Sequence, residues 1–461
     1  MSVKAVPRRL IPDRVPLPIL DPAERVNSFR EALLPYSREE AIEEARRCIQ
    51  CARAWCVEAC PISQDCREYL RQIAEGDFEG AAQTILRDNP LASCLGRVCY
   101  NYCEDACVIK KKGDPVAIRH LKRAALAYGD EGRTYSPSSP RGEAVAIVGA
   151  GPAGLAAAWY LGQRGFRVTV FEASDRLGGL MTQSIPPYRL PKDVFLQDLV
   201  RMEPLEIEFR QGVVVGRDVE LKGLFEEGYR AVFLGLGTHR SRTLGVPGED
   251  LPGVYPGLHF LKSVFRGEGP EITGTVVTIG GGDVAMDCAR SVLRLGAKRS
   301  IVLYRRTVEE MPASEEERED AEAEGVEFRF LVSPLAFGGD EGVEEVSLQG
   351  MELGPEDESG RRRPVPIEND VTTLPVANVL VAIGQVAELE GFPDVEIHVA
   401  RDGTPMGGGE AGATDMKGVF AGGGASVVHA VAAGTKAAEA IVQYLKGESS
   451  IVCQAPPGNL T

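Results

Sequence analysis

Two patterns of hydrophobic and polar residues follow one another along this chain, and the change falls near residue 128. Before it, the segments EEAIEEARR, FEGAAQTIL and AIRHLKRAALAYG are typical of helices. Ser37 and Glu40 have the spacing of a capping box at the start of the first of these helices. Residues 1–127 are therefore predicted to form a helical domain.

Beyond this point the pattern changes to short apolar runs that alternate with helical segments. A polar stretch rich in Pro, Gly and Ser (128–142) precedes the change and reads as a linker. The runs AVAIV, VTVFE, TVVTI and SIVLY are predicted strands, arranged as two strand–turn–helix–strand units of similar design. This alternation predicts an α/β class with parallel, doubly wound sheets.

The first of these units contains VAIVGAGPAGLAAAWYL, in which Gly149, Gly151 and Gly154 form the pattern G-x-G-x-x-G. Such glycines bring backbone N–H groups close to a pyrophosphate at a helix N-terminus. Glu172 ends the next strand, where a carboxylate binds the ribose. The segment DRLGG, which ends at Gly179, is typical of FAD-binding chains and indicates that this unit holds FAD.

The second unit contains VVTIGGGDVAMDCARSVLRLG, with Gly280, Gly282 and Ala285 in the variant pattern G-x-G-x-x-A. Its next strand ends in Arg305 and Arg306 rather than in an acidic residue. Guanidinium groups bind phosphate in a bidentate manner, so NADP(H) is predicted here, with NAD(H) as the alternative and two solvated surface arginines as the non-functional interpretation.

Nine of the eleven cysteines lie between Cys48 and Cys107, in the part predicted to be helical. Two 4Fe–4S clusters need about eight cysteine ligands, and two runs in this region supply eight. Two four-thiolate zinc sites are the alternative, although only Cys48 and Cys51 have the CxxC spacing common in zinc sites. The predicted ligands are Cys48, Cys51, Cys56, Cys60, Cys94, Cys99, Cys103 and Cys107.

Composition and charge narrow the function classes further. Hydrophobic residues make up 44% and charged residues 26%, as in globular proteins. The formal net charge of −16 disfavours nucleic acid and anionic lipid as partners. The uncharged stretch 144–162 contains Pro152 and several glycines, which argues against a membrane span, and the first residues lack the apolar core of a signal peptide. A cytoplasmic protein is expected.

Several longer motifs resemble one known family. EEARRCIQC, VAIVGAGPAGLAAA, IPPYRLP, GGGDVAMDCAR, LYRRTVEEMPA, VAIGQ and GVFAGGG are similar to segments of the glutamate synthase small (β) subunit. They also resemble the N-terminal half of dihydropyrimidine dehydrogenase and the flavin subunit of ferredoxin:NADP transhydrogenase complexes. The resemblance covers nearly the whole chain. It implies an oxidoreductase that passes electrons from NADPH through FAD and two 4Fe–4S clusters to a partner.

The resemblance also implies a domain order and further site residues. It places the cluster domain at 1–127, FAD-binding parts at 143–262 and 375–461, and the NAD(P)-binding domain at 263–374. Arg189 would then contact FAD, and Asp283 would contact NADP together with Gly282 and the two arginines. The motifs VAIGQ and GVFAGGG add Gly384 and Gly423 to the expected cofactor-binding residues.

In relatives, residues matching Cys60, Cys99 and Cys103 bind one cluster, and the fourth ligand is often an oxygen from the following helix. The matching position here is Lys122, whose protonated amine has no lone pair to donate. We therefore expect Cys94 to be the fourth ligand, with Cys66 as the competing candidate. The resemblance assigns the other cluster to Cys48, Cys51, Cys56 and Cys107.

One departure from the family keeps alternative functions open. Gly424 stands where relatives usually carry an aspartate that binds the flavin. The leading hypothesis is an electron-input subunit that works with a larger catalytic subunit in a hetero-oligomer. The alternatives are a stand-alone NAD(P)H:ferredoxin oxidoreductase and a cluster-bearing electron-transfer scaffold with weakened FAD binding.

Overall fold

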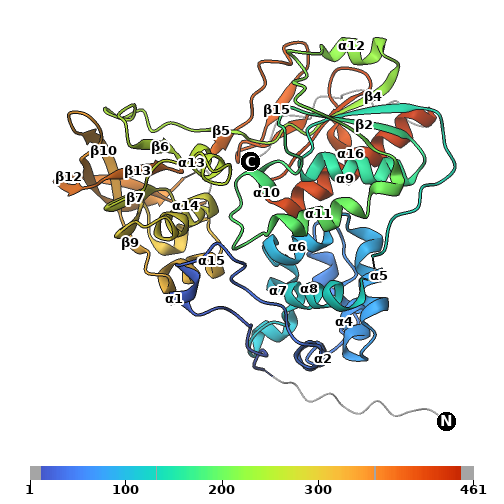
Figure 1. Ribbon diagram of the computed structural model, residues 1–461, viewed down its shortest axis with the longest axis horizontal. Coiled ribbons are helices and arrows are strands. Elements are labelled where there is room, and N and C mark those ends of the chain that lie inside the picture. Colours follow the sequence, from blue (N-terminus) through green and yellow to red (C-terminus); the bar gives the residue numbers. More distant parts are fainter. Residues whose placement is uncertain (1–11, 131, 358–359, 448–461) are drawn as a thin grey trace.

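A computed structural model describes residues 12–130, 132–357 and 360–447 of the chain. Figure 1 shows a helical part at the N-terminus, drawn in blue and cyan, below an α/β part that contains α9 and α16. A second α/β part, drawn mostly in yellow and orange, lies beside them. Cys453, one of the two isolated cysteines, lies outside the described residues.

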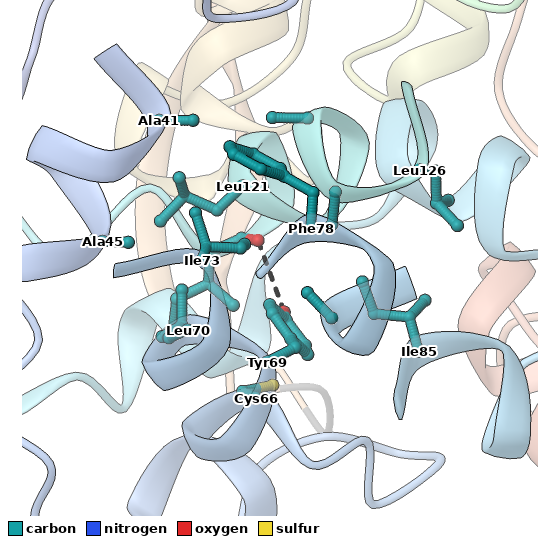
Figure 2. Close-up of a cluster of buried hydrophobic side chains, with 14 of the residues drawn as sticks. Ala41, Ala45, Cys66, Tyr69, Leu70, Ile73, Phe78, Ile85, Leu121 and Leu126 are labelled. Carbon is teal, nitrogen blue, oxygen red and sulfur yellow. Dashed lines mark hydrogen bonds between the residues drawn. The ribbon is translucent and has the colours of Figure 1, made fainter. Parts of the chain in front are cut away.

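In the helical part, α1, α2, α4 and α5 begin after a polar residue whose side chain caps the helix, and the longer helices bury one apolar face. Ser37 and Glu40 make the predicted capping box at the start of α2. Figure 2 shows the core that the helices share, where the hydroxyl group of Tyr69 donates to the carbonyl oxygen of Ile118 at 3.3 Å. The helices here are α1 (Pro22–Arg25), α2 (Arg38–Arg46), α3 (Trp55–Glu58), α4 (Cys66–Ala74), α5 (Phe78–Asp88), α6 (Ala92–Val98), α7 (Tyr102–Asp105), η1 (Val108–Lys111) and α8 (Ile118–Gly129).

The first α/β part is built on a parallel five-stranded sheet in the order β17-β4-β1-β2-β3. Its strands are β1 (Ala144–Val148), β2 (Arg167–Glu172), β3 (Glu208–Gln211), β4 (Tyr229–Leu234) and β17 (Val419–Ala421). Two long helices, α9 (Pro152–Gln163) and α16 (Val427–Lys446), pack against each other beside this sheet. The shorter elements are α10 (Leu180–Gln183), α11 (Lys192–Val200), η2 (Glu203–Leu205), α12 (Leu221–Glu226) and η4 (Glu410–Gly412).

The second α/β part has a parallel sheet in the order β6-β13-β7-β8-β9. Its strands are β6 (Val254–Pro256), β7 (Thr275–Ile279), β8 (Arg299–Tyr304), β9 (Glu327–Phe330) and β13 (Asn378–Val381). Its helices are α13 (Gly257–Val264), α14 (Asp283–Arg294), η3 (Val308–Glu310) and α15 (Glu315–Ala323). An antiparallel sheet of β10 (Val332–Gly338), β11 (Glu345–Glu356) and β12 (Arg362–Pro375) extends from it.

The strand pairing moves the predicted domain boundaries. Strands β6 and β13 pair within the second sheet, although the sequence boundaries assigned 254–256 and 378–381 to the FAD-binding parts. All these strands are short apolar runs, and only pairing across the fold decides which sheet each one joins. Two small pairs complete the described strands: β5 (Arg240–Ser241) with β14 (Gln385–Val386), and β15 (Ile397–Val399) with β16 (Pro405–Gly407).

The stretch 144–162 forms strand β1 and most of α9, and most of its residues are buried inside the first α/β part. Among the described residues, no helix combines the length and the apolar composition that crossing a membrane requires. Helix α1 lies beside the second α/β part, where Arg25 pairs with Asp320 of α15 at 2.8 Å. The N-terminal segment thus connects the helical part to the second α/β part.

Candidate functional site

Both glycine turns open onto one large cavity of about 1800 Å³ between the two α/β parts. A pocket for one small ligand occupies about 300–1000 Å³, so this cavity has room for more than one ligand. Arg and Lys side chains outnumber Asp and Glu along its walls, although the whole chain carries a net charge of −16. The cavity therefore suits ligands that carry phosphate groups.

The first turn joins β1 to α9, and its glycines leave no space for side chains. Gly149 has a φ of +99°, and a Cβ atom there would lie 2.4 Å from the carbonyl oxygen of Gly235. A Cβ atom at Gly154 would lie 1.9 Å from the carbonyl oxygen of Gly149. Gly151 precedes α9, and Gly179 lies so close that its Cβ would be 3.1 Å from the Gly151 Cα atom. The turn thus presents bare backbone at a helix N-terminus, which fits the pyrophosphate of FAD.

Glu172 lies at the end of β2, beside this turn and on the cavity wall. Its Oε2 atom accepts from the backbone N–H of Ala150 at 2.8 Å, and its Oε1 atom accepts from that of Ser174 at 2.8 Å. Each carboxylate oxygen retains a further lone pair for a ribose hydroxyl. The backbone therefore fixes the orientation of Glu172 on the cavity wall.

The second turn joins β7 to α14 and has the same design. Gly280 has a φ of +143°, and a Cβ atom there would lie 2.2 Å from the carbonyl oxygen of Ala382. A Cβ atom at Gly281 would meet the ring of Tyr304 at 2.5 Å. Gly282 precedes α14, while the third position, Ala285, is buried in the helix. This turn fits a second dinucleotide.

Three arginines lie on the cavity wall where β8 ends, and only two of them were predicted. Arg305 is exposed there, whereas Arg306 is 4% exposed. Arg306 donates from Nε to the carbonyl oxygen of Arg362 at 2.7 Å and pairs with Asp357 at 2.7 Å. The third, Arg361, directly precedes β12 in the β11–β12 turn. The bonds of Arg306 to Asp357 and Arg362 hold the two ends of this turn. The run RRR at 361–363 was a sequence signal for Arg361.

Asp283 and Arg189 face each other across the cavity wall, where the first α/β part meets the second. Arg189 pairs with Asp287 at 2.9 Å, with Glu317 at 2.7 Å and with Asp283 at 3.4 Å. Asp283 also accepts from the backbone N–H of Ser314 at 3.2 Å. Both residues line the cavity, but their partners show that they join the two α/β parts to each other.

Gly384 and Gly423 both line the cavity as well, Gly384 after β13 and Gly423 after β17. The next residue, Gly424, explains the missing aspartate, because a Cβ atom there would lie 2.4 Å from the backbone nitrogen of Ala430. Ser426 caps α16 directly after this turn by accepting from the backbone N–H of His429. The N-terminus of the 20-residue helix α16 thus lies at the cavity.

The cysteines of the helical part gather in two places. Cys48, Cys51, Cys56 and Cys107 line one small apolar cavity together with Ile49 and Trp55. This is the set that the resemblance implies for one cluster, and we call it the first thiol set. Ile49 is 40% exposed and Trp55 is 42% exposed, so the first thiol set lies close to the surface.

The second gathering surrounds the buried Lys122. Burial lowers the pKa of Lys122, but the charges of Cys99, Cys60, Cys66 and Cys103 together raise it above its usual value. Cys66 hydrogen-bonds with Cys103 and with Cys56, and these bonds, followed by burial, raise its pKa well above the usual value. We call Cys60, Cys66, Cys99 and Cys103 the second thiol set.

Cys94, which the sequence led us to expect as the fourth ligand of this set, lies in a different environment. Its backbone N–H donates to Asp198 of α11 at 2.9 Å, and its side chain also hydrogen-bonds with that carboxylate. Burial and the charge of Asp198 raise the pKa of the Cys94 thiol well above its usual value. Cys94 lies inside α6, whereas Cys99 follows the end of the helix in extended backbone, and the hydrogen-bond partner of the Cys94 side chain is Asp198.

The described His, Cys, Asp and Glu side chains include no group of three that converges on a single metal-ion position. A 4Fe–4S cluster does not require such convergence, because each cysteine binds a different iron of the cluster. The donors in both sets are cysteine thiols, which are the usual ligands of these clusters. Two sets of four thiols therefore fit two such clusters.

A contact that the sequence did not indicate joins the second thiol set to the large cavity. The ring of Tyr102, the neighbour of Cys103, packs edge-on against the ring of His429 with 5.1 Å between the centroids. Tyr102 also hydrogen-bonds with Ser426, which lines the cavity. Nothing in the sequence around His429 indicates this contact.

Comparison with known proteins matches both parts of the chain. Residues 25–133 match the family described as dihydropyrimidine dehydrogenase domain II, 4Fe-4S cluster. Residues 143–441 match the pyridine nucleotide-disulphide oxidoreductase family. The boundary between the two matches falls in the segment that was predicted to be a linker.

Two relatives and one solved structure extend these matches. The chain is 40% identical over 424 residues to the NADP(+)-dependent formate dehydrogenase subunit beta of Moorella thermoacetica, covering 85% of this chain and 60% of that protein. It is 35% identical to the glutamate synthase [NADPH] small chain of Halomonas elongata, covering 91% of this chain and 94% of that protein. The fold resembles Mycobacterium tuberculosis FprA in complex with NADPH (TM-score 0.57, 22% identity, 69% of this chain and 88% of that chain).

The glycine turns, the gathered thiols and these matches agree with one another. The family matches support FAD, NADPH and 4Fe–4S as the cofactors of this chain. The chain belongs to the pyridine nucleotide-disulphide oxidoreductase family and, within it, to the NADPH-linked flavin and iron–sulfur oxidoreductases that include the glutamate synthase small chain.

Proposed function

We propose that this chain is an electron-input subunit that takes electrons from NADPH in the large cavity and delivers them through two 4Fe–4S sites to a partner protein. The observation that carries the proposal is the single cavity onto which both dinucleotide turns open. FAD, when bound, supplies the hydride chemistry, so the protein need not provide an acid or a base. The residues of the chain position the two dinucleotides against each other.

The NADPH site in this proposal lies at the second turn. The N-terminus of α14, preceded by Gly282, faces the pyrophosphate, and Arg305 and Arg361 bind the 2′-phosphate. Arg306 acts mainly by holding the β11–β12 turn, since its guanidinium already bonds Asp357 and the backbone. The FAD site uses the first turn, Glu172 and the turn at Gly423.

In this proposal, electrons leave the cavity through the helical part. Val98 and Tyr100, which flank Cys99, line the large cavity, so the second thiol set lies nearer to the flavin site. The hydrogen bond between Cys66 and Cys56 connects the second set to the first. The exposed Trp55 and Ile49 beside the first thiol set mark the surface where we propose that the partner accepts electrons.

The relatives named above are themselves described as a subunit and as a small chain, which favours a hetero-oligomer for this chain as well. The partner would be a larger catalytic subunit. A ferredoxin would be the acceptor if the chain acts alone. Purification of the native complex separates these two cases, because a co-purifying chain identifies the first.

Anaerobic purification followed by metal and flavin analysis tests the proposed function. We expect one FAD and about eight irons per chain. NADPH should bleach the flavin absorbance and then produce the electron paramagnetic resonance signals of reduced clusters. Stoichiometric zinc with little iron, or a chain without flavin that NADPH does not reduce, would contradict the proposal.

A further inference from the structure

Cys66 differs from the other cysteines of the second thiol set because it lies outside the two cysteine runs. It is the first residue of α4, which packs against α3, and it hydrogen-bonds with Cys103 of α7; α3 and α7 both carry cysteines of those runs. Its side chain is 2% exposed and hydrogen-bonds with the sulfurs of Cys103 and Cys56 (Figure 2 shows it at the edge of the helical core). A buried thiol among other thiols is in a position to share their metal.

The first thiol set is already complete without Cys66. Its four sulfur-bearing residues line one cavity, and Cys66 is not among the residues of that cavity. The second set without Cys66 offers only the thiols of Cys60, Cys99 and Cys103, one fewer than the four that usually hold a 4Fe–4S cluster. Cys66 is therefore available to the second set, although it also touches Cys56 of the first.

The side chain of Cys94 lies in a different environment and already has a hydrogen-bond partner there. Cys94 lies within α6, whereas Cys99 follows the end of that helix in extended backbone. Cys94 is fully buried among apolar residues, including Leu155 and Trp159 of the first α/β part. It is held there by Asp198, whose other oxygen accepts from the backbone N–H of Ser93 at 3.0 Å.

We propose that Cys66, and not Cys94, is the fourth ligand of the second 4Fe–4S site, which is then an all-cysteine site formed by Cys60, Cys66, Cys99 and Cys103. The inference rests on the proposed function, since it requires a cluster at this place. Lys122 lies buried among the same four sulfurs and supplies positive charge beside a thiolate-bound cluster rather than a fifth ligand. The ligand set thus draws on a cysteine that no spacing pattern indicates.

The matched variants Cys66→Ala and Cys94→Ala test this assignment on the full chain purified without oxygen. Iron and sulfide content, flavin content and electron paramagnetic resonance spectra of the reduced protein are compared with those of the wild type. We expect Cys66→Ala to lose up to about four irons per chain, or to show a three-iron signal, while flavin content stays unchanged. Cys94→Ala should keep both clusters.

A second pair of variants covers the case in which Cys66→Ala folds poorly. Cys66→Ser keeps the size and offers an oxygen, so the site should stay filled with an altered spectrum and reduction potential. Cys66→Ala/Lys122→Glu should regain iron, because it places a carboxylate among the remaining three thiols. Unchanged iron and spectra in Cys66→Ala and Cys66→Ser, or iron loss in Cys94→Ala alone, would overturn the assignment. A wild type that holds zinc would instead overturn the proposed function.

Discussion

The two dinucleotide units of this chain share one backbone design but build their phosphate and ribose contacts differently. In the first unit, Glu172 is fixed by backbone N–H groups of Ala150 and Ser174, both close to it in the fold and one only two residues away. In the second unit, Arg361 comes from a turn that Arg306 holds through Asp357. The ligand-binding side chain of the first unit is therefore positioned by neighbouring backbone, whereas that of the second unit depends on the distant β11–β12 turn.

The third glycine position separates the two units most strongly. Gly154→Ala should abolish FAD binding, because its Cβ would lie 1.9 Å from the carbonyl oxygen of Gly149 and would force the turn apart. The second unit already has Ala285 at the matching position. Flavin absorbance of the purified variant measures the effect. Ala285→Gly serves as the control and should retain FAD; a Gly154→Ala protein with full flavin would show that the turn tolerates a side chain.

Nicotinamide preference tests the arginines of the second unit. A hydrogen bond to a charged group contributes about 1.5–3 kcal/mol, which is about 10- to 100-fold in affinity. Arg305→Ala and Arg361→Ala should each weaken NADPH binding by about this factor and leave NADH nearly unchanged, because only NADPH carries the 2′-phosphate. Steady-state kinetics with both nucleotides measures this ratio. Arg363→Ala, in the same RRR run but away from the cavity wall, is the control. Equal loss for NADH and NADPH would contradict the assignment.

Loosening the β11–β12 turn should reduce NADPH affinity less than removing Arg361, the arginine that this turn carries. Asp357→Asn removes the ion pair that Arg306 makes at 2.7 Å and should loosen the turn that positions Arg361. We expect NADPH affinity to decrease by about 3- to 10-fold, since one partly buried ion pair of about 1 kcal/mol is lost. The variant should bind FAD normally. An Asp357→Asn protein that binds NADPH as the wild type does would show that the hairpin is held by other contacts.

The smallest expected effect concerns the contact between the two units. Burial raises the pKa of Glu317, which pairs with Arg189, to about 7 despite the charges of Arg189 and Arg290. An acid with a raised pKa binds its proton more tightly in the folded state, so its contribution to stability is greatest below about pH 4.5 and declines as the pH rises to about 7. Glu317→Gln should make the melting temperature less dependent on pH across this range. The exposed Glu319→Gln is the control, and an unchanged slope in Glu317→Gln would contradict the expectation.

Features that depend on neighbouring residues were predictable from the sequence. The capping box at Ser37, the strands on either side of each glycine turn and the class of the fold follow from local patterns, and the structure and the family matches confirm them. The spacing of glycines with Glu172 predicted a turn whose geometry excludes side chains. Such features are decided by backbone conformation over a few residues, which a single sequence reveals.

Features that depend on pairing between distant segments were not predictable in the same way. The sequence of a short apolar strand does not show which sheet it joins: β6 and β13 pair in the second sheet, although the sequence boundaries placed their residues in the FAD-binding parts. Cys94 was expected rather than Cys66 because it lies near Cys99 in sequence, but Cys94 is in contact with Asp198 of α11. Arg189 was expected at FAD, and the structure shows it paired with three carboxylates of the second unit.

The sequence by itself therefore determined the chemistry of this protein: two dinucleotide turns, a carboxylate after one and arginines after the other, and enough cysteines for two clusters. Only the tertiary structure decided which groups meet, namely Cys66 with Cys103, Arg361 with the end of β8, and Tyr102 with Ser426. The physical reason is that residue type fixes what a side chain can bind, whereas the packing of helices and sheets fixes where it lies.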